Sequence, residues 1–200
     1  MGNGAAIRAY FQDKADGYAA ACGAGPWAWQ RRREASALID LAGPVAGQSA
    51  LDLGCGAGFY AGMLADAGAA PVVAVDATPA MLATIRDPRI EPFLGDAATV
   101  TLECRFDLVV VAGLLEFVAD PVAVLANARR HLASGGRVVV LCPPDTLAGQ
   151  LYRRFHRRHG FEITLFGRRQ FARLAERAGL ALSRSRRVFP YGDVHRMAVP

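Results

Sequence analysis

Short apolar runs and longer mixed segments alternate along the chain from about residue 50 onward. Runs that are apolar at nearly every position are typical of strands that are buried on both faces, as in a parallel sheet. They predict strands at residues 49–53, 71–76, 90–94, 106–112 and 137–142. Because the segments between them can hold crossover helices, we expect an α/β fold.

Proline and glycine mark the ends of the intervening helices. Pro26, Thr78-Pro79 and Asp120-Pro121 are typical of a first helical turn, where proline fits without losing a hydrogen bond and Thr or Asp can cap. Gly-containing or Asp-Pro pairs end the helices. We expect helices at residues 26–42, 59–67, 78–86 and 168–178, and one from Asp120 that Gly135-Gly136 closes.

The last third of the chain is less regular. Residues 143–166 begin with Pro143-Pro144 and contain a basic cluster, residues 153–159, without a clear strand or helix pattern. Residues 180–189 and 195–199 predict two final strands that are joined by a turn at residues 191–193.

Composition excludes several classes of protein. The 200 residues fit one domain, and no run of ~18 apolar residues predicts a membrane span. The N-terminal residues do not resemble a signal peptide. The cysteines lie far apart without a C-x-x-C pair, which predicts neither a zinc site nor a disulfide framework. We therefore expect no metal and a cytoplasmic location. The four cysteines are Cys22, Cys55, Cys104 and Cys142.

Charge is unevenly distributed along the chain. Residues 1–150 carry 11 basic and 15 acidic side chains, whereas residues 151–200 carry 12 basic and 3 acidic ones. The basic cluster leaves three interpretations open: a solvated helix face, a site for a substrate carboxylate or phosphate, or a contact with RNA or an anionic membrane surface. No aromatic RNA-binding module accompanies it, so nucleic acid is the weakest of the three.

The strongest candidate for chemistry is the segment Leu51-Asp52-Leu53-Gly54-Cys55-Gly56-Ala57-Gly58-Phe59. A strand here runs into a loop with a glycine at every second position, and the loop feeds a helix. Glycines allow a ligand to approach the backbone, and the amides of the first helical turn face the same ligand. The G-x-G-x-G spacing differs from the G-x-G-x-x-G fingerprint of nicotinamide and flavin dinucleotide sites.

Acidic residues end the next two predicted strands. Asp76 lies 20 residues after Gly56, and Asp96 follows Gly95. Ligands of doubly wound sheets bind beyond the carboxyl ends of the strands, where Asp76 can accept hydrogen bonds from both hydroxyls of a ribose. We do not assign helix capping to Asp76, because Thr78 can supply the cap.

Together, the glycine loop with Asp52, then Asp76, Gly95-Asp96-Ala97 and the segment from Gly113 to Pro121 resemble the motifs of class I S-adenosylmethionine-dependent methyltransferases, in particular the small-molecule group. The resemblance implies a Rossmann-like fold with a seven-stranded, mostly parallel sheet, an antiparallel last strand and helices on both faces. It covers residues 45–145 by motif and 160–200 by the order of elements.

The resemblance also implies roles for individual residues. Asp52 is expected near the methionine amino group, Asp96 at the adenine amino group and Met81 against the adenine ring, with core packing an equal alternative for Met81. Phe117 stands where many members carry His, which favours an apolar pocket wall. The implied contacts to S-adenosylmethionine, or to its product S-adenosylhomocysteine, are Asp52, Gly54, Gly56, Gly58, Asp76, Ala77, Met81, Asp96, Ala97 and Gly113.

The expected activity is methyl transfer to O, N or C of a small organic molecule by in-line displacement. The cofactor supplies the reactive methyl group, so a dense catalytic constellation is not needed. An O–H or N–H acceptor can require a base, for which His156 and His159 rank before His195 and Glu116. Alternatives are an RNA or protein methyltransferase and a nicotinamide-dependent oxidoreductase. The acceptor and the oligomeric state are not determined by the sequence.

The implied organisation is a single methyltransferase domain over residues 1–200. Its parts would be an N-terminal helical lid (1–45), a cofactor-binding core (46–142), a substrate lid (143–166), and a C-terminal helix with closing strands (167–200). Tyr10, Phe11 and Tyr18 resemble the segment that closes over the cofactor in many members, although core packing would explain them equally well.

Overall fold

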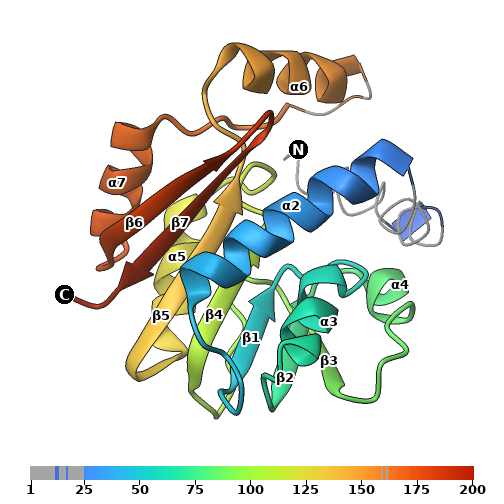
Figure 1. The fold of residues 1–200 in the computed structure, drawn as a ribbon, viewed down its shortest axis with the longest axis vertical. Coiled ribbons are helices and arrows are strands. Elements are labelled where there is room, and N and C mark those ends of the chain that lie inside the picture. The colour runs from blue at the N-terminus through green and yellow to red at the C-terminus, as the bar shows by residue number, and fades with distance from the viewer. Residues whose placement is uncertain (1–11, 14–16, 18–24, 159, 161) are drawn as a thin grey trace.

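A computed structural model describes residues 12–13, 17, 25–158, 160 and 162–200 of the chain (Figure 1). Their centre is a seven-stranded sheet with the strand order β3-β2-β1-β4-β5-β7-β6. The strands are β1 (Ala50–Leu53), β2 (Val72–Asp76), β3 (Ile90–Leu94), β4 (Phe106–Ala112), β5 (Leu132–Cys142), β6 (Ala181–Val188) and β7 (Gly192–Ala198). The helices are α2 (Gly25–Ala42), α3 (Phe59–Asp66), α4 (Pro79–Leu82), α5 (Pro121–Arg130), α6 (Leu147–Arg158) and α7 (Arg168–Arg177).

The direction of the strands confirms the expected fold. Strands β1 to β5 pair in parallel, and β7 is antiparallel to both of its neighbours, β5 and β6. From β1 the chain builds outward through β2 and β3, then returns to place β4 on the other side of β1. This reversal creates a topological switch point between β1 and β4, where ligands bind in folds of this kind.

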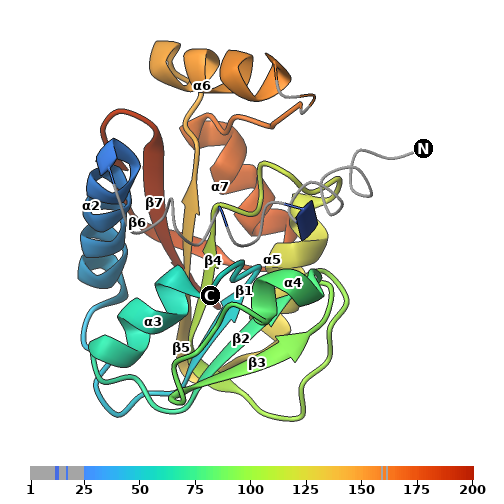
Figure 2. The same cartoon turned by 90° about the vertical axis from the view of Figure 1, so that its right-hand side faces the viewer.

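Two apolar layers cover the sheet, and β4 contributes to both. Leu108 and Val110 face a layer that α2 and α3 complete, whereas Val109 and Val111 face a layer that α5 and α7 complete. Figure 2 shows the sheet nearly edge-on between these helix pairs. The strand period of two residues sends successive side chains to opposite faces, so a continuous valine run serves both layers.

Helix α2 is fixed to the sheet by a buried arginine of β5. The guanidinium of Arg137 donates hydrogen bonds to the carbonyl of Ala42, to that of Pro44 (2.9 Å) and to Gln48 Oε1 (2.8 Å). Arg137 thereby satisfies the carbonyl of Ala42, the last residue of α2, which has no partner within the helix, and that of Pro44 just beyond it. This contact holds the helix against the face that also carries α3.

Four element boundaries differ by three or more residues from those expected from the sequence. Helix α5 ends at Arg130 rather than at Gly135-Gly136, and β5 begins at Leu132 rather than at residue 137, because Leu132 pairs with Phe106 of β4. Helix α4 stops at Leu82 instead of residue 86; Thr84 Oγ1 donates to the Met81 carbonyl, a local bond that competes with a continuing helix. Strand β7 already begins at Gly192.

The irregular segment after β5 contains a helix that the sequence did not predict. Helix α6 lies at the carboxyl ends of β4 and β5, apart from the two helical layers (Figures 1 and 2). Among the described residues, no helix is both long and apolar enough to cross a membrane.

Candidate functional site

The glycine loop connects β1 to α3 in a backbone conformation that its glycines permit. Gly54, Gly56 and Gly58 have φ values of 77°, 54° and 81°, which side chains with a Cβ rarely adopt. The amides of Gly54 and Cys55 both donate to the Val75 carbonyl, at 2.8 and 3.0 Å. A Cβ on Gly54 would lie 2.7 Å from Leu114 Cδ2. The loop is thus held between β2 and the segment after β4.

Asp76, at the end of β2, ties this loop to the next turn. Its Oδ2 accepts a hydrogen bond from the Gly56 amide and its Oδ1 accepts one from the Thr78 amide, each at 2.9 Å. The expectation that Thr78 caps α4 with its side chain was wrong, because its hydroxyl makes no capping bond. Asp76 provides the local amide contact instead, and each of its oxygens keeps a second lone pair for a ligand.

A pocket of about 450 Å³ opens at the switch point between β1 and β4. The ends of β1, β2, β3 and β4 all contribute to its walls. Most of the expected cofactor residues lie together here. Those that line the pocket are Gly54, Gly56, Asp76, Ala77, Met81, Asp96, Ala97 and Gly113.

Two expected cofactor residues are not among the residues that line the pocket. Asp52 is 1% exposed, and neither of its carboxylate oxygens has a hydrogen-bond partner among the described residues. Burial, reinforced by the negative charge of Asp76, raises the pKa of Asp52 to about 7. Gly58 forms the start of α3; its amide donates to the Cys55 carbonyl, and Ile85 occupies the space beside it.

The pocket also contains residues that the sequence analysis did not assign. Phe59 and Tyr60 follow the glycine loop directly, so their place in the first turn of α3 could have identified them. Arg31 arrives from α2 through tertiary packing, and no local pattern marks it. Its guanidinium lies 5.9 Å from the centroid of the Phe59 ring, where a cation–π contact is favourable. The unassigned lining residues include Arg31, Phe59, Tyr60, Ala98, Thr99, Leu114 and Val118.

Phe117 lines the pocket, in agreement with its interpretation as an apolar wall. The preceding residue, Glu116, is buried beside it, and its Oε2 has no hydrogen-bond partner among the described residues. Burial is the main cause that raises the pKa of Glu116 to about 8, and the charge of Glu34 adds to it. Glu116 does not line the pocket, and this argues against Glu116 as the base for an acceptor bound there.

The histidine candidates are separated by the fold. His156 lies on α6, where its ring makes edge contacts with Tyr152 (4.4 Å between centroids) and with Phe117 (5.6 Å). His195 is buried in β7, stacks on Phe171 and has Ser185 Oγ 2.8 Å from its Nδ1. Burial lowers the pKa of His195 to about 4, which indicates a neutral packing residue. His159, together with Tyr10, Phe11, Tyr18 and Cys22, lies outside the described residues.

Three of the four cysteines lie among the described residues. Cys55 and Cys142 are buried thiols, Cys104 is exposed, and burial raises the pKa of both buried thiols. Within the described part of the chain, no cluster of His, Cys, Asp or Glu could hold a metal ion. Cys55 lines the pocket as a neutral, compact side chain rather than a reactive thiolate.

Comparison with known proteins gives a family match for the part of the chain that carries the motifs. Residues 51–140 match the methyltransferase domain family. The trans-aconitate 2-methyltransferase of Methylobacterium radiotolerans is 36% identical over 127 residues, which are 62% of this chain and 48% of that protein. The ubiquinone biosynthesis O-methyltransferase of Pseudomonas paraeruginosa is 33% identical over 108 residues, which are 50% of this chain and 46% of that protein. The chain thus spans less than half the length of these relatives.

A solved structure shares the fold over nearly the whole chain. The magnesium protoporphyrin IX methyltransferase from Synechocystis PCC 6803, crystallised with S-adenosylhomocysteine, superposes with a TM-score of 0.77. The match covers 98% of this chain and 99% of that one at 17% sequence identity. These matches do not favour the nicotinamide-dependent alternative.

Proposed function

We propose that this chain, whose residues 51–140 match the methyltransferase domain family, transfers a methyl group from S-adenosylmethionine to a small organic acceptor. The observation that carries this proposal is the convergence of the glycine loop, Asp76, Asp96 and Gly113 on one pocket. The names of its relatives also refer to small molecules: one is a trans-aconitate 2-methyltransferase and another is an O-methyltransferase of ubiquinone biosynthesis.

We assign the cofactor's parts to this pocket by the chemistry of its walls. The free lone pairs of Asp76 suit the two ribose hydroxyls, while Asp96 and Met81 suit the amino group and the ring of adenine. Gly54 and Gly113 would allow the methionine part to lie against the backbone. Asp52 is buried and does not line the pocket, so a contact from it would require a bridging water or a shift of the loop.

S-adenosylmethionine supplies an activated methyl group on a sulfonium, whose departure leaves a neutral thioether. The protein's task is therefore to align the acceptor with the methyl carbon and to exclude water. Leu114, Phe117 and Val118 form the apolar wall that suits this task. Acceptor methylation on O, N or C is compatible with such a wall.

His156 is our candidate proton acceptor for an O–H or N–H substrate, because its ring contacts the pocket residue Phe117. His159 remains a second candidate from the sequence, on the same segment. A carboxylate or phosphate on the acceptor remains a further proposal, for which Arg31 is the basic residue that lines the pocket. A cytoplasmic location remains a prediction from the cysteine pattern.

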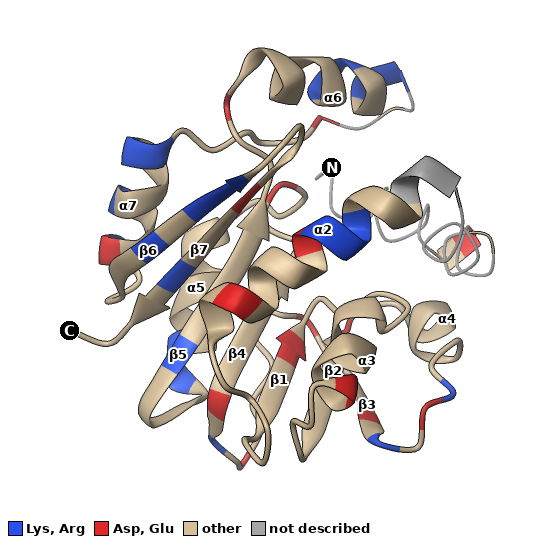
Figure 3. Ribbon diagram, viewed as in Figure 1, with Lys and Arg blue, Asp and Glu red and all other residues tan. Residues whose placement is uncertain are grey.

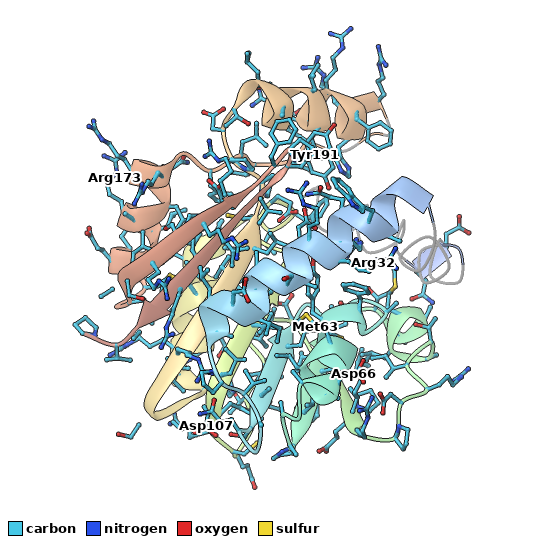
Figure 4. The ribbon with its side chains drawn as sticks, viewed as in Figure 1. Arg32, Met63, Asp66, Asp107, Arg173 and Tyr191 are labelled. Atoms are coloured by element: carbon cyan, nitrogen blue, oxygen red, sulfur yellow. The ribbon has the colours of Figure 1, made fainter. Side chains whose placement is uncertain are left out.

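Calorimetric titration with S-adenosylhomocysteine tests the proposal. We expect micromolar binding to the wild-type protein. Asp76→Ala should weaken binding by roughly 1–3 kcal/mol, because the ribose hydroxyls and two loop amides lose their acceptor. Asp66→Asn is the matched control: it also removes one negative charge, but Asp66 lies at the end of α3 and is exposed (Figure 4). No binding to the wild-type protein would refute the cofactor assignment.

A further inference from the structure

Helix α6 has an inner face that is anchored to the rest of the molecule. Gly149 is buried so closely against residue 144 that a Cβ on it would collide with the Pro144 carbonyl. One helical turn further on, the Tyr152 ring stacks on Tyr191 with centroids 5.5 Å apart. Figure 4 shows Tyr191 next to α6. With the His156–Phe117 contact, these interactions fix which face of the helix points away from the protein.

The outer face of α6 carries an apolar stripe. Leu147, Leu151 and Phe155 are 87%, 65% and 48% exposed. Their spacing of four residues turns the helix by about 40° at each step, so the three side chains lie in one row. We call these three residues the outer stripe. Isolated exposed apolar residues are ordinary, but a row of three on one helix is typical of a contact surface.

Exposed arginines border the outer stripe. Arg154 and Arg158 follow Leu151 and Phe155 by three residues and are therefore their neighbours on the helix, and Arg157 lies on the same flank. The helix itself contains no acidic residue. Within the described part of the chain, none of these three arginines pairs with a carboxylate. Figure 3 shows the blue segments of α6 at the upper end of the molecule.

We propose that α6 docks the protein on an anionic lipid bilayer, with the outer stripe among the lipid headgroups and the arginines on lipid phosphates. A bilayer satisfies both parts of this face at once, because apolar side chains gain burial while long arginine side chains reach the charged surface. RNA would engage the arginines but would leave the outer stripe in water. The helix lies on the membrane and does not span it.

The helix that carries the docking face also contacts the proposed methyl-transfer pocket, through its inner face. His156 and Tyr152, on the inner face, connect the docked helix to Phe117 of the pocket wall and to Tyr191. A bilayer under α6 would therefore lie near the apolar wall of the pocket, where an acceptor dissolved in lipid could enter. The docking itself does not depend on the proposed methyl transfer.

Vesicle sedimentation with the full chain and without cofactor tests this surface. We expect the protein to bind vesicles of phosphatidylglycerol and phosphatidylcholine at least tenfold more tightly than vesicles of phosphatidylcholine alone. Binding should weaken as salt is added, because the attraction between arginine and phosphate is screened. Equal binding to the two vesicle types, or none to either, would overturn the proposal.

Matched variants locate the contact. The triple change Arg154→Gln/Arg157→Gln/Arg158→Gln should reduce binding to anionic vesicles at least tenfold. The triple change Arg169→Gln/Arg173→Gln/Arg177→Gln on α7 gives the same net charge and should leave binding within twofold. Figure 4 labels Arg173, on this second helix. Leu151→Ser should reduce binding about fivefold and Val199→Ser, at another exposed apolar site, should not. Circular dichroism verifies that each variant is folded.

Other occupants of this face give different results. If a second copy of the chain covered the outer stripe, Leu151→Ser would dissociate a dimer in sedimentation velocity while vesicle binding stayed low. If RNA were the partner, the triple α6 variant would lose binding to a labelled oligonucleotide and Leu151→Ser would retain it. Either result would overturn docking on a bilayer. S-adenosylhomocysteine titration of the same variants would still report separately on the cofactor pocket.

Discussion

The two sides of the pocket are built by different means. On one side, which we call the cofactor wall, lie the glycine loop, Asp76 and Asp96. Short contacts to backbone amides hold it, such as those from Asp76 to Gly56 and Thr78. On the other side, which we call the roof, Phe117 meets the rings of α6, and ring-to-ring contacts hold it.

This difference has a consequence for how each side responds to change. At the positive φ values of the glycine loop, glycine is the residue that fits without strain. The amides of Gly56 and Thr78 in turn need the carboxylate of Asp76 as acceptor. We therefore expect the cofactor wall to tolerate few substitutions. Aromatic contacts each contribute modestly and can rearrange. We therefore expect binding of S-adenosylhomocysteine to depend on the wall, and acceptor use to depend on the roof.

Gly54→Val should break the cofactor wall and have the largest effect. The new side chain would occupy a positive φ and collide with Leu114, for a combined cost of roughly 2–5 kcal/mol in the free energy of unfolding. We expect S-adenosylhomocysteine binding to fall below detection by calorimetry. Gly62→Ala is the control, because Gly62 lies within α3 with nothing near its Cβ position; urea denaturation should show it to be more stable by about 0.5–1 kcal/mol.

Asp52→Asn should change how stability depends on pH. The pKa of Asp52 is about 7 in the folded protein and near 3.8 in the unfolded chain. The folded state therefore favours the protonated carboxyl. The resulting contribution to the unfolding free energy is fully present below pH 3.8 and is lost as the pH rises through 7. Asparagine stays neutral, and the fall in unfolding free energy between pH 5 and pH 8 should shrink by roughly 1–3 kcal/mol. Urea denaturation across this range measures it.

Asp107→Asn supplies a control of opposite sign. Hydrogen bonds from the Ser49 hydroxyl and amide lower the pKa of Asp107, which lies near the amino ends of the strands, far from the pocket (Figure 4). Its contribution to stability is present above its unfolded pKa and is lost as the pH falls. The variant should therefore be less stable than the wild type at pH 7 and similar to it in acid. An Asp52→Asn profile parallel to that of the wild type would contradict the burial of a protonated carboxyl.

His156→Ala tests the roof and should have the smallest effect. It removes edge contacts to Tyr152 and Phe117, which we expect to lower the unfolding free energy by about 1 kcal/mol. Because the ring contacts of His156 are to Phe117, Tyr152 and Phe155, on the roof and α6, the affinity for S-adenosylhomocysteine should stay within twofold in calorimetry. A tenfold loss would show that wall and roof are coupled rather than independent.

Sequence patterns were most informative where local chemistry dictates structure. The valines of β4 and the glycine loop were located correctly, because strand periodicity and positive-φ turns are properties of a few adjacent residues. Eight of the expected cofactor residues line the pocket for the same reason: the ends of parallel strands meet at one edge. The start of β5 was misplaced, because Leu132 is drawn into the sheet by its pairing with Phe106, far away in sequence.

By itself, the sequence determined the order of the strands along the chain, the acids at their carboxyl ends and the match of residues 51–140 to the methyltransferase domain family. Tertiary structure alone decided that Asp52 is buried outside the pocket lining while Arg31 enters the pocket from α2. It also decided that α6 presents Leu147, Leu151 and Phe155 to the outside. The physical reason is that exposure depends on which distant elements pack against a residue, and no spacing along the chain records it.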